Sequence, residues 1–456
     1  FLKSTAAVAG GLALGAAPFV RRLAGPPNVL FIVVDALRAD RLGHAGYHRA
    51  LTPFLDSLCE RGVFFSDAAA ASSWTKTSMA TIFSGLHPPV HGVLDPPSCI
   101  PMKAELLSIM LRREGYFTFQ AQTNPWLGAE GYGFSRGFDV FEFLSPDRTK
   151  GLRRQVEGME GFTYGRGEDV LERLEKAVPV IGRFGKRFFG YLHLMDVHAP
   201  YLPGGPYDGL FSMPGSLDMD DIVLNREVIT FSGQAIKEYP ERLRSRCLDL
   251  YDGCVRKIDD IIAKIVALFE TNGMMSNTLL VITADHGEEF WEHGKVGHAH
   301  NLYEEALRVP FVMVGADMPR GVEINERALH VDFAPTVLDA LGIRPSGRMD
   351  GKSLLPAISG ARRDARDAVN ISYLGKVCGT TSRAMTTLAP HAKIILSDDG
   401  VRQHKELYDL RKDPSETQNL AAENVAVADS LEREFERRIE LAGANAFERS
   451  EQSLPD

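Results

Sequence analysis

Apolar residues along the chain follow two patterns that alternate with each other. Continuous apolar runs end in or near an acidic residue at 28–35, 188–196 and 277–287, which is typical of strands buried on both faces of a parallel sheet. Between the last two runs, residues 244–270 have the apolar spacing of an amphipathic helix. Weaker signals of the same kinds predict helices at 51–61, 102–114 and 425–441 and a strand at 115–124. This alternation predicts an α/β domain with a mostly parallel central sheet.

Three of the apolar runs place a carboxylate at the end of a predicted strand. These acids are Asp35, Asp196 and Asp285. In open α/β sheets, ligands bind in the crevice at the carboxyl ends of the strands, where such side chains converge. We therefore expect the functional site at this edge of the sheet.

Changes in composition divide the chain into three parts. Residues 1–25 combine a short basic start with an apolar, Ala- and Gly-rich stretch, which predicts an export signal; the opening FLK is similar to the tail of a twin-arginine signal. A buried amino-terminal helix or a retained anchor is the alternative. Residues 26–365 are predicted to form the main domain, with an irregular insertion at 202–243 over its rim. Short strand-like runs and a charged terminal helix predict a small α+β subdomain at 366–456.

Charge and cysteine content exclude several classes of partner and site. The formal net charge is −9, and 60 acidic residues are interspersed with 51 basic ones, so no basic patch predicts a nucleic-acid partner. The five cysteines are far apart and form no C-x-x-C pair, which argues against a disulfide framework or a thiolate zinc site. Removal of the signal leaves no stable membrane span, so we expect an exported protein, either periplasmic or secreted.

The acids and histidines of the chain are concentrated in short motifs. The motifs are NVLFIVVDALRADRLG (28–43), SSWTKTSMATIFSGLHPPVHGV (72–93), LHLMDVHAPY (192–201), TADHGEEFWEHG (283–294), LYEEALRVP (302–310), DFAPTVLDALG (332–342), DGKSLLP (350–356) and ELYDLRKDPSETQNL (406–420). Their order resembles the sulfatase branch of the alkaline phosphatase superfamily, over nearly everything after residue 27. The resemblance implies a three-layer αβα fold with a small carboxyl-terminal subdomain, and the hydrolysis of an ester.

Asp35, Asp285 and His286 are the metal ligands that the resemblance implies. A carboxylate at a buried strand end costs less when it binds a cation than when it lies alone. The alternatives are a helix-capping or salt-bridged Asp35 and a purely structural hydrogen bond between Asp285 and His286. Many sulfatases carry a second acid where this chain has Ala36. The remaining mixture of carboxylate and imidazole favours Zn or Mn over Ca.

Thr75 is predicted to be the nucleophile and a further metal ligand. True sulfatases carry Cys or Ser at the matching position, inside C/S-x-P-x-R, and convert it to formylglycine. Here the window reads TKTSM (75–79), so formylglycine cannot form. A metal-activated Thr hydroxyl can still attack phosphorus. The alternative is a purely structural role, in which Thr75 is the N-cap of the helix that follows.

Five further residues are candidates for contact with the substrate. His198 matches a family histidine that can protonate the leaving group, although it could equally be a loop histidine bonded to backbone. His298 lies where sulfatases bind the substrate with Lys or His, and Lys295 is a weaker candidate for that role. Asn124 or Thr123 is expected to contact an oxyanion. Asp196, His198 and His298 also suggest a second metal site.

The resulting hypothesis is a metal-dependent hydrolase of phosphate or phosphonate esters, mono- or diesters, that forms a phospho-enzyme on Thr75. A sulfatase that acts without formylglycine is the first alternative, and a phosphoryl transferase is the second. A catalytically inactive binding module is less consistent with the joint presence of Asp35, Thr75, Asp285 and His286. The expected partner is a small phosphate or sulfate ester.

Overall fold

The computed structural model describes residues 25–443, except 130, 145–164, 212–240, 362–369, 376, 378–380, 387–390 and 399. The predicted export signal and most of the predicted rim insertion lie outside the described residues, as does the boundary expected between residues 365 and 366. In the part of the chain that the structure describes, no helix combines the length and the apolar character needed to cross a membrane.

A nine-stranded mixed sheet forms the centre of the molecule. The strand order is β10-β2-β9-β6-β1-β5-β3-β4, and β11 pairs with β2. The strands are β1 (Asn28–Val34), β2 (Val63–Ala69), β3 (Phe117–Gln122), β4 (Val140–Phe143), β5 (Phe188–Leu194), β6 (Thr278–Ala284), β9 (Arg308–Val314), β10 (Val322–Ile324) and β11 (Ala328–Leu329). β9 is antiparallel to its neighbours β2 and β6, while the other pairs are parallel. The mostly parallel sheet is therefore confirmed.

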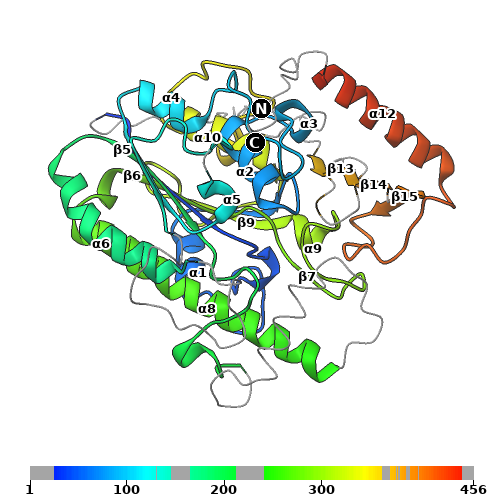
Figure 1. Cartoon of the computed structure of the whole chain (residues 1–456), viewed down its shortest axis with the longest axis horizontal. Helices are drawn as coiled ribbons and strands as arrows, with labels where there is room; N and C mark the ends of the chain where they lie inside the picture. The colour runs from blue at the N-terminus through cyan, green and yellow to red at the C-terminus, as the bar shows by residue number, and fades with distance from the viewer. Residues whose placement is uncertain are drawn as a thin grey trace, which may run out of the picture.

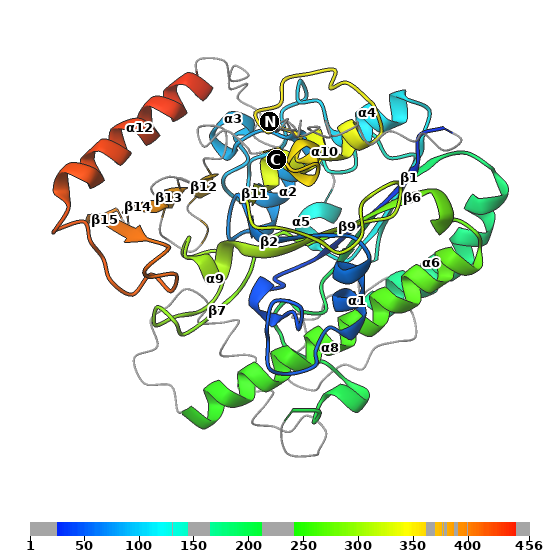
Figure 2. The same ribbon diagram turned by 180° about the vertical axis from the view of Figure 1, so that it is seen from behind.

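Helices cover both faces of this sheet, which gives the predicted three layers (Figures 1 and 2). One face carries α1 (Pro53–Arg61), α6 (Gly167–Arg183) and α8 (Glu241–Thr271). The other carries α2 (Thr75–Ser84), α3 (Pro88–His91), α4 (Leu107–Arg113), α5 (Pro125–Gly128) and α10 (His330–Ala340). Every residue of α2 is buried. The predicted helices at 51–61, 102–114 and 244–270 are confirmed as α1, α4 and α8.

The carboxyl-terminal part forms a small antiparallel sheet with one helix beside it. Its strands pair in chain order: β12 (Asn370–Leu374), β13 (Thr381–Thr386), β14 (Ala392–Asp398) and β15 (Gln403–Asp409). α12 (Val425–Gly443) buries Phe435 against Ile371, Ile394 and Leu396 of this sheet. Four short elements lie in connections of the chain: β7 (Glu289–Phe290), β8 (Val296–Gly297) and α9 (Glu304–Leu307) between β6 and β9, and α11 (Leu355–Ile358) between α10 and β12. The expected α+β subdomain is present in the fold.

Candidate active site

Asp35 and Asp285 directly follow two neighbouring strands, β1 and β6, at the same edge of the sheet. β1 and β6 are parallel, with Val34 opposite Ala284, so the next residue of each strand lies at the same edge. The backbone N–H of Asp35 donates to the carbonyl of Leu194 at 2.9 Å, which ties this edge to β5 as well. Both carboxylates are completely buried. The register of three strands thus brings the two acids together.

Thr75 lies beside these acids at the start of α2. Trp74 occupies the N-cap position and Thr75 is the first helical residue, so the alternative role of Thr75 as the N-cap is wrong. The Thr75 Oγ1 lies 3.4 Å from Asp35 Oδ2 and 3.3 Å from His286 Nε2. Its side chain is therefore directed at the strand-end acids.

Four atoms from Asp35, Asp285, His286 and Thr75 form a compact buried group, here called the carboxylate cage. The His286 Nε2 lies 3.7 Å from Asp35 Oδ1 and 3.5 Å from Asp285 Oδ2. These two carboxylate oxygens are buried and have no hydrogen-bond partner. Tetrahedral coordination with bonds of about 2.0–2.2 Å separates neighbouring ligand atoms by about 3.4 Å. The spacing and the two unpartnered oxygens therefore fit a divalent metal ion.

The electrostatics of the cage agree with that assignment. Burial alone would raise the pKa of Asp35, but the charges of His198 and His193 and the hydrogen bond from His193 hold this pKa well below its usual range. Burial would lower the pKa of His286, yet the Asp285 and Asp35 carboxylates raise it above its ordinary value. Among the described residues, neither carboxylate has a Lys or Arg partner. Two buried carboxylates without such partners are costly, and a bound cation offsets that cost.

Asn124, rather than Thr123, faces the predicted nucleophile. The Asn124 Nδ2 donates to Asp35 Oδ2 at 2.7 Å and lies 3.5 Å from Thr75 Oγ1. Its Oδ1 accepts the backbone N–H of Trp126 at 2.8 Å, which caps α5 and fixes the amide. The Thr123 hydroxyl instead donates to the carbonyl of His193 at 3.3 Å. Of the two predicted oxyanion contacts, the geometry therefore favours Asn124.

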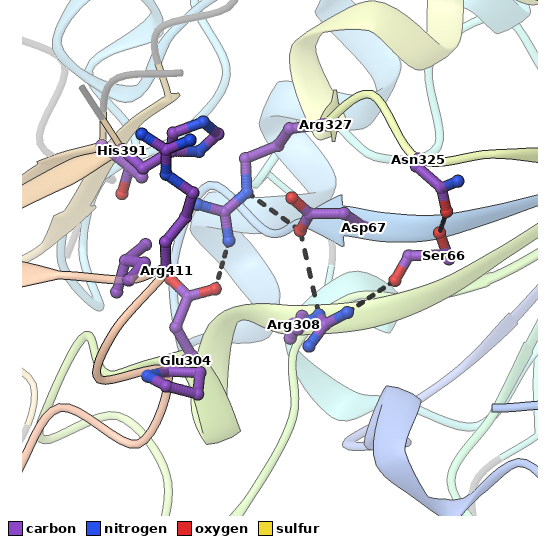
Figure 3. Close-up of a pocket in the computed structure, with 11 residues that line it drawn as sticks. Ser66, Asp67, Glu304, Arg308, Asn325, Arg327, His391 and Arg411 are labelled. Atoms are coloured by element: carbon purple, nitrogen blue, oxygen red, sulfur yellow. Dashed lines mark hydrogen bonds and ion pairs between the residues drawn. The ribbon is translucent and has the colours of Figure 1, made fainter. Parts of the chain in front are cut away.

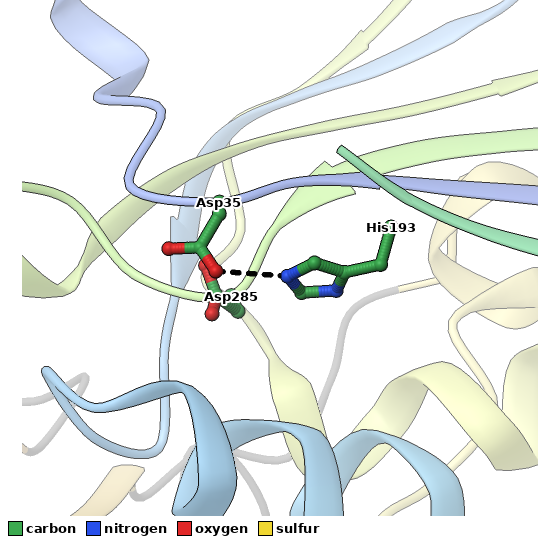
Figure 4. A group of neighbouring side chains, drawn as sticks. All are labelled: Asp35, His193 and Asp285. Carbon is green, nitrogen blue, oxygen red and sulfur yellow. Dashed lines mark hydrogen bonds and ion pairs between the residues drawn. The ribbon is translucent and has the colours of Figure 1, made fainter. Parts of the chain in front are cut away.

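His193 is a site residue that the sequence did not reveal. It lies on β5 opposite Val33 of β1, and its Nε2 lies 2.9 Å from Asp35 Oδ2 (Figure 4). Asp35, His193 and Asp285 offer ligand-type atoms that all lie within 4.8 Å of one another. The available signal is a histidine inside an otherwise apolar, fully buried strand.

His198 and His298 are partly buried and lie beside the cage, next to the buried His286. The His298 ring is 4.4 Å from the ring of His286 and 4.7 Å from that of His198. The His298 Nδ1 is 2.8 Å from Glu288 Oε1, and Glu288 also accepts the Tyr201 hydroxyl at 2.9 Å. The His198 Nδ1 is 2.5 Å from the carbonyl of its neighbour Ala199. Burial lowers the pKa of His298, although Glu288 opposes the shift.

Asp196 and Lys295 do not join the cage. Asp196 lies two residues beyond the end of β5, and its carboxylate accepts the backbone N–H of Gly167 at 2.6 Å and pairs with Lys257 at 2.9 Å. The expectation that Asp196 marks the site is therefore wrong, and the second metal site built on it has no support. Lys295 belongs to the hairpin between β7 and β8, where its backbone N–H donates to Glu289 at 2.7 Å. In the described part of the chain, no contact joins the Lys295 side chain to the cage.

A cavity of about 310 Å³ lies where the main domain meets the carboxyl-terminal sheet (Figure 3). Arg308 and Arg327 line it from the main domain, and His391 and Arg411 line it from the carboxyl-terminal part. None of the cage residues lines this cavity. The cavity is therefore separate from the candidate active site. The short helix α9 contacts both: its Glu304 lines the cavity, and its Glu305 and Ala306 carbonyls accept backbone N–H groups of the two residues after His286.

The fold and the cage define a hydrolase of the alkaline phosphatase superfamily: an α/β sheet with paired acids at its strand ends and a hydroxyl beside them. The family model for sulfatases matches residues 27–343, and the chain belongs to the Sulfatase family. The model named N-sulphoglucosamine sulphohydrolase, C-terminal, matches residues 292–441. Members of this superfamily hydrolyse esters, and the present chain is one of these enzymes.

The similarity to known proteins extends over most of the chain. The multifunctional alkaline phosphatase superfamily protein PehA of Trinickia caryophylli is 24% identical over 489 residues, which cover 87% of this chain and 91% of PehA. Human arylsulfatase K is 24% identical over 467 residues, which cover 95% of this chain and 86% of the relative. Among solved structures, the phosphonate monoester hydrolase of Silicibacter pomeroyi aligns with a TM-score of 0.73 and 19% identity, covering 94% of this chain and 100% of that one. This structural likeness shows the fold.

Proposed function

We propose that this protein is a metal-dependent hydrolase of phosphate or phosphonate esters, with Thr75 as the nucleophile. The observation that carries the proposal is the position of Thr75 Oγ1, 3.3 Å from His286 Nε2 at the edge of the cage. The window TKTSM (75–79) has Thr where formylglycine maturation requires Cys or Ser, and it lacks the required Pro and Arg. The nucleophile is therefore the unmodified hydroxyl.

The residues of the cage fit Zn or Mn better than Ca, because an imidazole and two carboxylates form a mixed donor set. Asp35, Asp285, His286 and Thr75 would hold the ion. When bound, the metal lowers the pKa of the Thr75 hydroxyl and stabilises charge on the non-bridging oxygens of the ester. The His286 Nδ1 lies 2.8 Å from the Gly287 carbonyl, so Nδ1 carries the proton and Nε2 offers its lone pair to the cage.

The remaining steps use side chains of this chain. The Thr75 hydroxyl loses its proton to solvent and its oxygen attacks phosphorus, the bond from phosphorus to the leaving alcohol breaks, and His198 gives that alcohol a proton. Asn124 presents an amide N–H beside the Thr75 hydroxyl, where it can donate to an oxygen of an ester bound next to that hydroxyl. Water then attacks phosphorus and gives a proton to His198, the bond between phosphorus and the Thr75 oxygen breaks, and phosphate or phosphonate is released. A proton from solvent restores the threonine hydroxyl.

The names of similar proteins support two substrate classes. PehA and the phosphonate monoester hydrolases support a phosphorus ester, whereas arylsulfatase K supports a sulfate ester. The chemistry of Thr75 favours phosphorus. A phosphothreonine is cleared by a second attack at phosphorus, while sulfated formylglycine is cleared by breaking its C–O bond, which a threonine ester cannot do.

The test compares matched phosphate, phosphonate and sulfate esters with the same leaving group. We expect kcat/KM for the phosphorus esters to exceed that for the sulfate by about 10²-fold or more, which corresponds to about 2.7 kcal/mol. Thr75→Ala should abolish turnover and Thr75→Ser should keep part of it. Mass spectrometry of protein quenched during turnover should find a phosphoryl group on the Thr75 peptide. A faster sulfatase reaction, or an active Thr75→Ala enzyme, would contradict the proposal.

A further inference from the structure

The two oxygens of the Asp35 carboxylate have different surroundings. The Oδ2 atom is held by His193 Nε2 at 2.9 Å and by Asn124 Nδ2 at 2.7 Å. The Oδ1 atom is buried, has no hydrogen-bond partner and lies 3.7 Å from His286 Nε2. One oxygen is thus held by the protein while the other faces the cage.

A buried tyrosine holds the far side of His193. Tyr191 and His193 are two residues apart on β5, so their side chains point to the same face of the sheet. The Tyr191 hydroxyl lies 2.7 Å from His193 Nδ1, and both residues are completely buried. Phe83 packs edge-on against the Tyr191 ring, with 4.9 Å between ring centroids. The tyrosine is therefore fixed in place beside the imidazole.

The contact between His193 and Asp35 requires a proton on one nitrogen of the imidazole. A nitrogen 2.9 Å from a carboxylate oxygen must carry a proton to form a hydrogen bond, so Nε2 is the donor. On the other side of the ring, Nδ1 lies 2.7 Å from the Tyr191 hydroxyl, which holds the imidazole in this orientation. His286 has the opposite arrangement, with its Nδ1 proton on the Gly287 carbonyl and its Nε2 lone pair toward the cage. The two histidines on either side of Asp35 thus have different roles.

We infer that His193 is a positioning residue: the chain from Tyr191 through His193 to Asp35 Oδ2 fixes Asp35 so that Oδ1 faces the metal. The inference rests on the metal centre proposed above. The need for such a device follows from Ala36, because the residue after Asp35 supplies no second carboxylate to the site. Each remaining ligand then contributes more to the affinity, and a rotated Asp35 would remove one of them. Removal of such an outer partner typically costs about 10- to 100-fold in metal affinity.

The experiment measures the Kd of the full-length protein for Zn²⁺ and Mn²⁺ by competition with a chromophoric chelator. His193→Leu should weaken binding by about 10- to 100-fold. His193→Gln should remain within about threefold of the wild type, because a glutamine amide N–H can reach the place of Nε2–H. Tyr191→Phe should weaken binding by a smaller factor, because the imidazole keeps its contact with Asp35 but loses the hydroxyl that holds its Nδ1. Thermal unfolding of the metal-free variants checks that each one folds.

Two controls and one spectrum separate positioning from ligation. His91→Gln and Tyr116→Phe remove a buried histidine and a buried tyrosine elsewhere in the domain, where they contact Thr81 and Pro27, and should leave the Kd unchanged. The visible spectrum of the Co²⁺ protein should be the same in wild type and His193→Gln. A changed spectrum with an affinity as low as that of His193→Leu would make His193 a metal ligand and overturn the inference. Unchanged affinity in every variant would also overturn it while leaving the metal centre intact, whereas a wild-type protein that binds neither ion would refute the proposed function itself.

Discussion

The molecule contains two buried clusters of charge that solve the same physical problem differently. The carboxylate cage holds Asp35 and Asp285 without an arginine or lysine partner among the described residues. A second cluster, here called the seam cluster, consists of Glu304, Glu416, Lys393 and Arg327, between the main domain and the carboxyl-terminal sheet. There Lys393 Nζ lies 2.9 Å from Glu304 Oε1 and 2.8 Å from Glu416 Oε1, and Arg327 pairs with Glu304.

The difference between the clusters indicates their roles. In the seam cluster each carboxylate forms an ion pair with Lys393 or Arg327, so the charges are paired within the chain and the cluster joins two parts of the fold. Glu416 Oε1, which has no aligned hydrogen bond, is still paired with Lys393. In the cage, one oxygen of Asp35 and one of Asp285 also lack a hydrogen-bond partner, but among the described residues the ion-pair partners of these two acids are imidazoles. Buried charges are tolerated when they are paired or coordinate a metal. The seam cluster therefore stabilises the structure, and the cage is suited to binding an external cation.

The largest effect should come from removing one carboxylate of the cage. Asp285→Asn should lose the metal and reduce kcat/KM by about 10³-fold or more, about 4 kcal/mol, while the chain stays folded because the strand register holds the residue. Elemental analysis and kinetics on the same sample check both parts. The matched control is Glu304→Gln, which removes a carboxylate from the seam cluster and should keep the metal. Equal metal loss in the two variants would remove the distinction between the clusters.

His198→Ala should have the next largest effect, and only on some substrates. A general acid matters in proportion to how much the leaving alcohol needs a proton, so alkyl esters should lose roughly 10²- to 10⁴-fold in rate. Nitrophenyl esters, whose leaving group departs without help, should lose far less. Kinetics on both esters with the same variant provide the internal control. Equal losses on both would show that His198 binds the substrate rather than protonating the leaving group.

Lys393→Met should destabilise the fold without affecting the cage. Removing one partner of a buried ion pair typically costs about 3–5 kcal/mol, because the remaining carboxylates are left unpaired. Urea unfolding measures this loss, and metal content per folded chain should be unchanged. The control is Lys405→Met, which removes a one-third exposed partner of Asp429 and Glu432 and should cost about 0–1 kcal/mol. A loss below about 1 kcal/mol for Lys393→Met would make the seam cluster unimportant for stability.

The sequence predicted the sheet and the cage better than it predicted their surroundings. Asp35 and Asp285 directly follow central parallel strands, so their convergence could be inferred from the apolar runs alone. Asp196 ends a similar run, but it lies two residues beyond the end of β5, whereas Asp35 and Asp285 follow their strands directly. Its partner Lys257 comes from α8, and no local pattern reveals that contact. His193 was not predicted, because it lies inside a buried strand and the sequence does not show which face of that strand points to the site.

The smallest predicted effect is a pH dependence of opposite sign in the two regions. Beside the seam cluster, burial would lower the pKa of His293, but the hydrogen bond and charge of Glu305 raise it to about 9. A histidine whose pKa is higher in the folded state stabilises the protein fully below its unfolded value of 6.5, and this contribution is lost as the pH rises through about 9. Glu416 acts in the same direction over a lower range, since burial raises its pKa to about 7.

Metal binding at the cage should instead strengthen as the pH rises, because its ligands must be deprotonated. The two effects separate in an Asp285→Asn background, where the free energy of unfolding in urea should fall by at most about 3 kcal/mol between pH 6.5 and 9.5. Adding His293→Gln should flatten this decline, since the glutamine keeps a polar side chain but does not titrate. An equally steep decline with His293→Gln would assign the pH dependence to groups outside the contact between His293 and Glu305.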